Sequence, residues 1–131
     1  MNLRPVLIDT SSWVEALRVD GESEVRNRVA GHLQSGGAAC CELVMLELWN
    51  GARGASERKK LMEIERNLIM LEITPRVWEK ARELSKRART AGHTITATDL
   101  VIAACALVHG AVMDHCDNHY DIVMSTAVHT G

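Results

Sequence analysis

The sequence is poor in several residue types that mark particular classes of protein. Among its 131 residues there are two prolines, one tyrosine and no phenylalanine. No stretch rich in proline or glycine divides the chain, so we expect one domain over residues 1–131. The longest strongly apolar run, residues 100–108, is far shorter than the roughly 20 residues that cross a bilayer. We therefore expect no membrane span and no membrane partner.

Two further features are missing from the pattern of the sequence. The N-terminal residues reach an acid at Asp9 without the long apolar centre of a signal peptide, which predicts a cytoplasmic protein. Four cysteines are present, but none of them has Cys-x-x-Cys spacing. Without that spacing and without a secretory signal, neither a zinc knuckle nor a disulfide framework is indicated, and we interpret the cysteines as reduced, mostly packed thiols.

Lysine and arginine are absent after Arg89, although the whole chain carries a net charge of only -2. That net charge does not indicate a nucleic-acid-binding protein. The distribution of charged residues along the sequence is more informative. Residues 90–131 contain four acids, whereas residues 76–89 contain six bases and two acids. The C-terminal part is therefore acidic and attracts cations, whereas the segment before it is basic.

Short apolar runs alternate with helical patterns along the chain. The runs predict strands at about residues 5–8, 38–41, 69–73, 111–113 and, more weakly, 127–130. The helical patterns start near Ser12, where Ser12 and Glu15 have the spacing of a capping box, and continue at about 22–34, 43–53, 56–68, 75–91 and 98–109. This alternation predicts an α/β protein with three α/β/α layers: a mostly parallel central sheet of four to five strands, flanked by helices.

Four carboxylates interrupt or border apolar sequence, where a charge is costly unless it is paired or binds a metal. Asp9 ends the first strand, Glu47 lies in the helix after the second, Asp99 begins the helix before the fourth, and Asp117 follows the fourth. All four positions belong to the carboxyl edge of a parallel sheet, where ligands bind in such folds. We therefore expect the four carboxylates to converge.

Clustered carboxylates repel one another, and no lysine or arginine lies near them in the sequence. A divalent cation is the expected stabilising partner, and oxygen ligands favour Mg²⁺ or Mn²⁺ over zinc. Such a site suits phosphodiester hydrolysis by a metal-activated water, which implies a nucleic-acid substrate. Basic residues 53, 58–60 and the face of 76–89 could hold its backbone, and the candidates for RNA contact are Arg53, Lys80 and Arg87.

Four segments, VLIDTSSWVEAL, CELVMLELWNGARGASER, ITATDLVIAACALVHGA and DHCDNHYD, resemble in order and spacing the PIN-domain ribonucleases, in particular VapC-type toxins of toxin–antitoxin pairs. The resemblance covers nearly the whole chain. It implies that Asp9, Glu47, Asp99 and Asp117 are catalytic metal-binding acids and that Ser11 is a small hydroxyl residue beside them. It also implies an endoribonuclease dependent on Mg²⁺ or Mn²⁺, which forms a homodimer and is inhibited by an antitoxin whose tail covers the site.

The chain departs from the family pattern at two places. Cys40 and Cys41 stand near the end of the second strand, where the family often has Ser or Thr, and Tyr120 replaces a Phe after the last acid. Asp114 and Asp121 are close enough in sequence to substitute for Asp117. His115, Asp117 and His119 alternate, which on an extended segment would put two imidazoles and a carboxylate on one side, as in transition-metal sites. The two histidines are interpreted mainly as phosphate contacts or solvated groups.

Two other functions are compatible with parts of this pattern. Asp9 at a strand end also suits aspartyl-phosphate chemistry, as in receiver domains or aspartate-nucleophile phosphatases. However, Ser11 stands where the phosphatases need a second acid, and receivers need a late lysine that this chain lacks. The other alternative is a non-catalytic RNA- or protein-binding module on the same fold, which would not require four acids.

Overall fold

The computed structural model describes residues 4–128, and the elements below are those of this range. Its strands are β1 (Val6–Ile8), β2 (Ala38–Cys40), β3 (Ile69–Met70) and β4 (Val112–Asp114). Its helices are α1 (Thr10–Leu17), α2 (Ser23–Ser35), α3 (Glu42–Gly51), α4 (Ala55–Glu65), α5 (Pro75–Thr90), α6 (Ala97–His109) and α7 (Asn118–Val128).

The strands form one parallel sheet in the order β3-β2-β1-β4. Val6 of β1 is in register with Ala38 of β2 on one side and with Val112 of β4 on the other. The strand order therefore reverses at β1, which places the crevice for a ligand beside the carboxyl ends of β1 and β4. The predicted parallel sheet is confirmed, with four strands.

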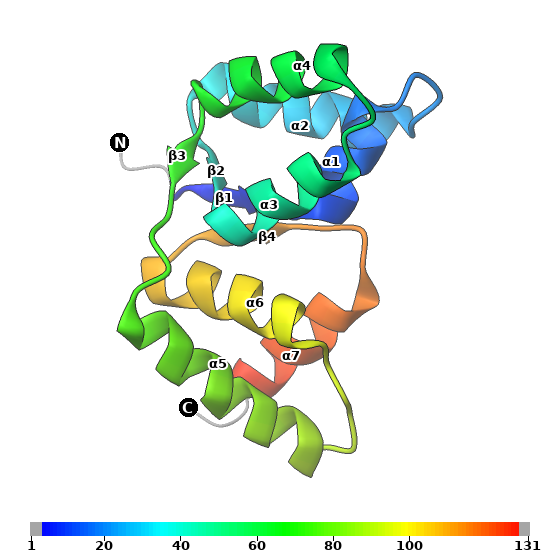
Figure 1. Cartoon of the computed structure of the whole chain (residues 1–131). Helices are drawn as coiled ribbons and strands as arrows, with labels where there is room; N and C mark the ends of the chain where they lie inside the picture. Colours follow the sequence, from blue (N-terminus) through cyan, green and yellow to red (C-terminus); the bar gives the residue numbers. More distant parts are fainter. Residues whose placement is uncertain (1–3, 129–131) are drawn as a thin grey trace.

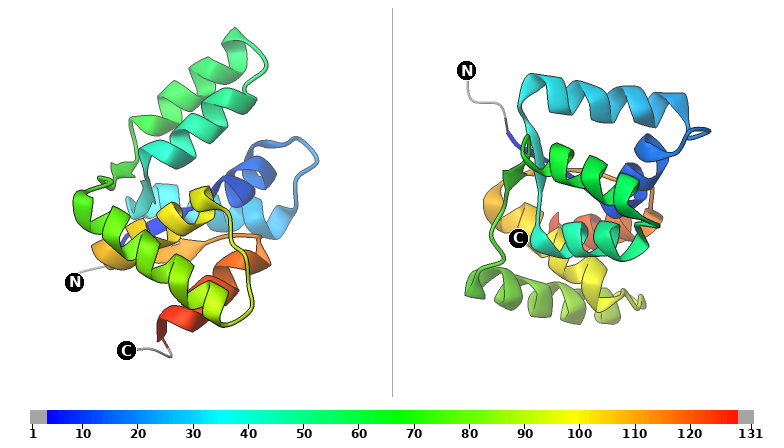
Figure 2. Two further views of the ribbon diagram at one scale, coloured as in Figure 1. Left: turned by 60° about the horizontal axis from the view of Figure 1, so that its bottom comes forward. Right: turned by 45° about the horizontal axis from the view of Figure 1, so that its top comes forward.

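Helices cover both faces of this sheet, so the predicted three-layer α/β/α architecture is also confirmed. Helices α5, α6 and α7 pack together on one face, below the strands in Figure 1, whereas α1 and α2 pack together on the other. Helices α3 and α4 form a hairpin that projects from the rest of the molecule, which is clearest on the left of Figure 2. Within residues 4–128, no helix combines the length and apolarity needed to span a bilayer.

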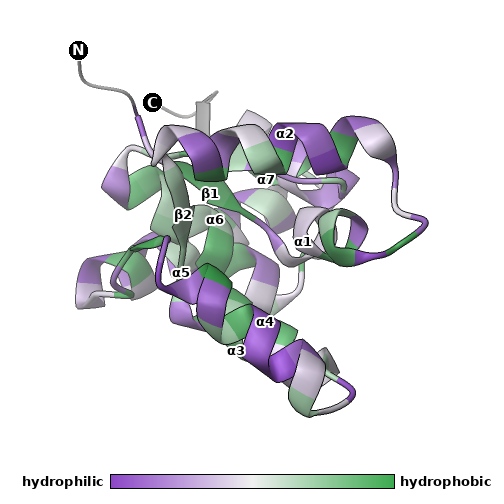
Figure 3. Ribbon diagram, turned by 90° about the horizontal axis from the view of Figure 1, so that it is seen from above, coloured by the Kyte–Doolittle hydropathy of each residue, from purple (hydrophilic) through white to green (hydrophobic). Residues whose placement is uncertain are grey.

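The core lies where the central strands meet α6. Every residue from Leu100 to Ala106 is buried, which explains why this helix is apolar on all sides. Strands β1 and β2 are apolar as well, and Figure 3 shows them among the hydrophobic parts of the helices. Cys40, Cys41 and Cys105 belong to this core as free thiols, while Cys116 is free and exposed. Burial raises the pKa of Cys40 to about 12, so its thiol is not reactive at neutral pH.

The boundaries of most elements follow local capping chemistry. Helix α5 begins with Pro75 after the cap Thr74, and α6 begins after Thr96, whose hydroxyl accepts the backbone N–H of Asp99. Helix α6 ends at His109 and is capped by Gly110, whose φ of 67° favours glycine. The helix expected from Ser12 begins two residues earlier, because the carboxylate of Asp9 accepts the backbone N–H of Ser11 and caps it. The capping box expected at Ser12 and Glu15 is therefore wrong.

The C-terminal part differs most from the sequence prediction. A fifth strand was expected at residues 127–130, but residues 127 and 128 belong to α7, and the rest lies outside the described residues. Helix α7, which contains residues 127 and 128, packs on α5 and α6. The third strand is also shorter than expected and ends at Met70.

Candidate functional site

The candidate site lies at the carboxyl edge of the sheet. There the chain leaves β1 and β4, and α6 and α7 begin; these four points lie together on the right of Figure 1. Asp9 follows β1, Asp99 lies in the first turn of α6, and Asp117 directly precedes α7. The parallel topology thus places acids from distant parts of the sequence at one edge.

Asp9 is the most buried of these acids, with 4% of its surface exposed. Its Oδ2 accepts hydrogen bonds from the backbone N–H of Ser11 at 3.0 Å and from the Ser11 hydroxyl at 2.7 Å. Ser11 Oγ in turn accepts the backbone N–H of Cys116 at 3.0 Å. Ser11 therefore joins the start of α1 to the segment that carries Asp117.

Tyr120 connects two of the acids through its hydroxyl. The phenolic oxygen lies 2.7 Å from Oδ1 of Asp9 and 3.0 Å from Oδ1 of Asp99, and the residue is fully buried in α7. Burial and the two neighbouring carboxylates raise the pKa of Tyr120 above its ordinary value, so the hydroxyl keeps its proton at neutral pH. Tyr120 thus acts as a hydrogen-bond donor between Asp9 and Asp99.

A second group contains Asp99, Asp117 and His119. Each of the three residues offers one ligand atom, and these atoms all lie within 4.8 Å of one another. Nδ1 of His119 is 3.6 Å from Oδ2 of Asp99 and 3.5 Å from Oδ1 of Asp117. The backbone N–H of His119 also donates to Oδ1 of Asp117 at 2.9 Å, which fixes Asp117 at the start of α7. Asp99 therefore belongs to both groups.

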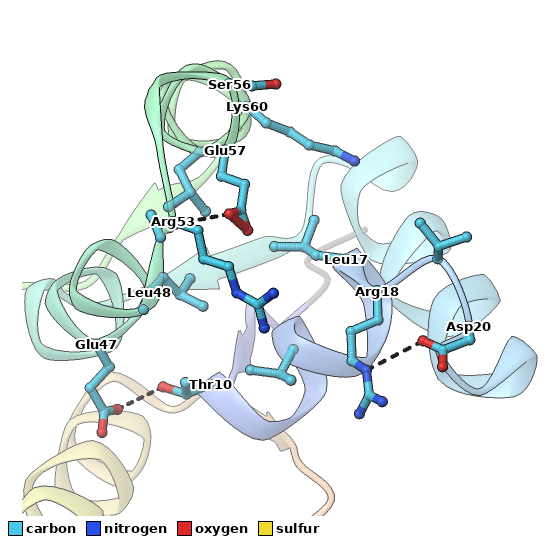
Figure 4. Close-up of a pocket in the computed structure, with 15 residues that line it drawn as sticks. Thr10, Leu17, Arg18, Asp20, Glu47, Leu48, Arg53, Ser56, Glu57 and Lys60 are labelled. Atoms are coloured by element: carbon cyan, nitrogen blue, oxygen red, sulfur yellow. Dashed lines mark hydrogen bonds and ion pairs between the residues drawn. The ribbon is translucent and has the colours of Figure 1, made fainter.

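Glu47 lies apart from these groups, on the outward side of α3. Although Glu47 follows an apolar stretch of sequence, its side chain is exposed. Its Oε1 accepts a 2.6 Å hydrogen bond from the hydroxyl of Thr10, the residue after Asp9. Figure 4 shows the two side chains pointing toward each other. The structure thus places Glu47 beside the start of α1 and does not include it in the group formed by Asp99, Asp117 and His119.

A groove of about 830 Å³ extends from Thr10 and Glu47 between α1 and the α3–α4 hairpin (Figure 4). Its wall combines apolar side chains, among them Val14, Leu17, Leu48 and Leu61, with three basic and three acidic residues, which are Arg18, Arg53, Lys60, Asp20, Glu47 and Glu57. Arg53, a predicted RNA contact, extends into this groove, and its backbone N–H donates to Glu57.

The other two predicted RNA contacts lie on α5, where Lys80 and Arg87 each form an ion pair with Glu83.

Asp114 and Asp121, the possible substitutes for Asp117, have other partners. Asp114 is buried and forms two hydrogen bonds with the guanidinium of Arg28, at 2.7 and 2.9 Å, and a third with the hydroxyl of Ser12. Asp121 is exposed and pairs with Nε2 of His115 at 3.2 Å. Neither belongs to the group of Asp99, Asp117 and His119.

Comparisons with known proteins agree with this architecture. The family model for the PIN domain matches residues 6–123. The chain belongs to the PIN domain family. Ribonuclease VapC11 of Mycobacterium tuberculosis is 32% identical over 123 residues, which cover 90% of each chain. The predicted resemblance to VapC-type PIN domains is therefore confirmed.

Two solved structures share the fold of this PIN domain. FitAcB from Neisseria gonorrhoeae has a TM-score of 0.77 at 21% identity, over 92% of this chain and 93% of that one. A toxin–antitoxin complex from Klebsiella pneumoniae has a TM-score of 0.69 at 15% identity, over 86% and 87% of the two chains.

The donor atoms at the carboxyl edge of this PIN domain fit a divalent cation. Asp99 and Asp117 are partly exposed, so an ion could reach them, and they lie beside an imidazole nitrogen. Within residues 4–128, the ion pairs of lysine and arginine side chains go to Glu15, Asp20, Glu83 and Asp114, not to the four predicted ligands. Carboxylate oxygens without a cationic side chain are typical ligands of Mg²⁺ and Mn²⁺.

Sequence reasoning missed two residues of this edge. Tyr120 was noted only as an unusual aromatic residue, because nothing in the sequence indicated that its hydroxyl would lie between two acids. An extended segment would place His115, Asp117 and His119 on one side, as in a transition-metal site, but His119 was interpreted mainly as a phosphate contact or solvated group. The segment instead turns into α7, which directs His119 toward Asp99 and His115 toward Asp121. A predicted helix at residues 118–128 would have been needed to place His119 and Tyr120 at this edge.

Proposed function

We propose that this PIN domain is an endoribonuclease dependent on Mg²⁺ or Mn²⁺, acting as the toxin of a type II toxin–antitoxin pair. The observation that carries the proposal is the meeting of Asp99, Asp117 and His119, with Asp9 joined to Asp99 through Tyr120, at the carboxyl edge. The similarity to a relative named as a ribonuclease supports the same activity.

Each acid has a role that follows from its surroundings. Asp99 and Asp117 would hold the ion directly, because their ligand atoms are close together and partly exposed. Asp9 would contribute its remaining lone pair, while Ser11 and Tyr120 fix the orientation of its carboxylate. Glu47, held by Thr10, would complete the site from α3, through a second ion or by orienting a water.

When bound, a divalent ion lowers the pKa of water and neutralises charge on the phosphate oxygens. The protein contributes orientation and charge. Glu47 and Asp117 are the more exposed acids, so they are the candidates to accept a proton from the attacking water. Arg53, Lys80 and Arg87 would hold the RNA backbone, and Arg53 lines the same groove as Glu47.

An antitoxin partner is part of the same proposal. One of the solved structures with this fold is a toxin–antitoxin complex. The groove between α1 and α3–α4 begins at Thr10 and Glu47, so a peptide bound in it would reach the site. We place the protein in the cytoplasm together with its RNA substrate, which immunodetection in fractionated cells would test.

We also propose a homodimer. Ile69 and Met70 of the edge strand β3, and Trp78 of α5, are exposed apolar side chains that a second copy could cover. Light scattering of the purified chain should give twice the monomer mass. Replacing Trp78 with Glu should shift it toward the monomer, and a monomeric mass for the unchanged chain would contradict this part of the proposal.

RNA cleavage by the purified chain tests the proposed activity. Cleavage should require Mg²⁺ or Mn²⁺, stop with EDTA and fall by about 1,000-fold or more in Asp9→Asn and Asp99→Asn, because both variants keep the side-chain volume and remove a ligand charge. Asp121→Asn, on the same helix as Tyr120 but directed to His115, is the matched control. Undiminished cleavage in both site variants would refute the assignment.

The same preparation distinguishes the alternatives. Aspartyl-phosphate chemistry at Asp9 would appear as labelling by acetyl phosphate, which we do not expect because Ser11 stands where the phosphatases need a second acid and no lysine follows Arg89. A non-catalytic binding module would bind RNA or protein without cleavage and without saturable Mn²⁺ binding. Mapping of cleaved RNA ends in cells would then identify the substrate.

A further inference from the structure

His119 is the one nitrogen donor in the group of possible metal ligands that the described residues form. Its Nδ1 lies 3.6 Å from a carboxylate oxygen of Asp99 and 3.5 Å from one of Asp117. Ligand atoms that share an ion at about 2.1 Å lie about 3.0 to 3.5 Å apart, depending on the coordination geometry. The distances from Nδ1 of His119 to these two carboxylate oxygens are therefore close to those between ligands of a shared ion.

The hydrogen bonds around the two aspartates direct an ion toward the same side. Oδ2 of Asp9 already accepts two hydrogen bonds from Ser11. Oδ1 of Asp9 and Oδ1 of Asp99 both face the hydroxyl of Tyr120. Oδ2 of Asp99 accepts none of these hydrogen bonds and faces His119. An ion bound by Asp99 at this oxygen meets the imidazole.

We infer that His119 is a metal ligand of this PIN domain and that its imidazole makes the site prefer Mn²⁺ to Mg²⁺. The inference rests on the proposed metal-dependent function and specifies which ion that function uses. Half of the His119 side chain is exposed, so the ring can adjust by the few tenths of an ångström that coordination needs.

The preference follows from the chemistry of the donor. Mg²⁺ is a hard ion that favours oxygen ligands, near-ideal octahedral geometry and retained waters. Mn²⁺ accepts an imidazole nitrogen more readily, and transition-metal ions in general bind mixed nitrogen and oxygen sites more tightly than Mg²⁺ does. Replacing His119 by an oxygen ligand should therefore reduce the preference, whereas removing the ligand should weaken Mn²⁺ binding.

The test is calorimetric titration of the full chain with Mn²⁺ and with Mg²⁺, without RNA, in three variants. His119→Ala should weaken Mn²⁺ binding by about tenfold or more and change Mg²⁺ binding less. His119→Asp should keep Mn²⁺ binding but shift the ratio of the two dissociation constants toward Mg²⁺. His109→Gln is the matched control, because it removes an imidazole about 15 Å along α6 from Asp99. It should leave both constants unchanged.

Pulsed electron paramagnetic resonance gives a direct readout of the bond. Mn²⁺ bound to the unchanged chain should show modulation from a coordinated ¹⁴N nucleus, and this signal should be lost in His119→Ala. Saturable Mn²⁺ binding that depends on Asp99, but with no nitrogen modulation and an unchanged Mn²⁺ to Mg²⁺ ratio in both His119 variants, would overturn the role of His119 alone. Absence of saturable Mn²⁺ binding in the unchanged chain would overturn the proposed metal site as well.

Discussion

The hydroxyl of Tyr120 lies 2.7 Å from a carboxylate oxygen of Asp9 and 3.0 Å from one of Asp99. A phenol has one proton, so it donates to one of these carboxylates at a time. The contact holds two acids, 90 positions apart in the sequence, on either side of one buried atom. We therefore expect Tyr120 to position the ligands of the proposed ion without binding it.

Tyr120→Phe tests this positioning role. The variant keeps the ring in its buried place and removes only the hydroxyl, so the two carboxylates lose their shared donor. We expect Mn²⁺ affinity to fall by about tenfold to 100-fold, as is typical for residues that orient metal ligands. Calorimetric titration measures this, with near-ultraviolet circular dichroism to show that packing is retained. Unchanged affinity in a folded variant would assign Tyr120 to packing alone.

Thr10→Val tests the coupling between α1 and α3. The variant is nearly isosteric and removes the hydroxyl that donates to Glu47, so Glu47 should lose its fixed orientation. RNA cleavage should fall by about tenfold, with a stability change within about 0.5 kcal/mol. Thr90→Val is the control, since it removes a hydroxyl that donates only to the backbone of Lys86 at the end of α5. Equal cleavage by the two variants would exclude a role for this hydrogen bond.

The buried ion pair of Asp114 and Arg28 predicts a pH dependence of stability. Burial by itself raises the pKa of Asp114, but hydrogen bonds from Arg28 and Ser12 and the charge of Arg28 outweigh it, so the pKa lies below its ordinary value. The folded protein thus binds this proton more weakly than the unfolded chain does. The stabilisation is fully present above the unfolded pKa of about 3.9 and is lost as the pH falls below it.

Urea denaturation of Asp114→Asn measures the size of this effect. At pH 7 the variant should be less stable by about 1 to 3 kcal/mol, because a buried, charged hydrogen-bond acceptor is lost. The difference from the unchanged chain should narrow as the pH falls below about 4, where Asp114 itself becomes protonated. Asp121→Asn should differ by less than about 0.5 kcal/mol, because that carboxylate is exposed. A difference for Asp114→Asn that stays constant with pH would contradict the linkage.

Gly21 tests a close approach of two backbone segments. A Cβ atom at this position would lie 1.8 Å from the carbonyl oxygen of Glu15, so Gly21→Ala must displace the turn between α1 and α2. We expect a loss of about 1 to 3 kcal/mol in urea denaturation. A Cβ atom at Gly31, inside α2, would meet no such neighbour within 4 Å, so Gly31→Ala should stabilise by about 0.5 to 1 kcal/mol. Equal effects of the two substitutions would argue against the clash.

The sequence predicted the fold where local patterns and global packing agree. The apolar stripe after Pro75 and the wholly apolar segment 100–108 lie in α5 and α6, and the runs predicted at 5–8 and 38–41 contain the adjacent parallel strands β1 and β2. The prediction failed at the C-terminus. There, the pattern of residues 118–128 is weakly periodic, and its helix is stabilised by packing on α5 and α6.

The candidate site was predictable to the extent that topology determines it. A carboxylate at the end of β1 and another at the start of α6 must share an edge in a parallel sheet, so Asp9 and Asp99 could be paired from the sequence. Which acids have a cationic partner could not be predicted, because Arg28 reaches Asp114 from 86 positions away. The positions of His119 and Tyr120 could not be predicted either, because both depend on the direction in which α7 leaves the preceding loop.

A crystal structure of the chain with Mn²⁺, recorded with anomalous scattering, tests the central claim most directly. The claim is that acids from β1, α6 and the start of α7 share one divalent ion. We predict an anomalous peak within about 2.3 Å of carboxylate oxygens of Asp99 and Asp117, and none there in Asp99→Asn. A structure at saturating Mn²⁺ with no peak between these residues would contradict the account.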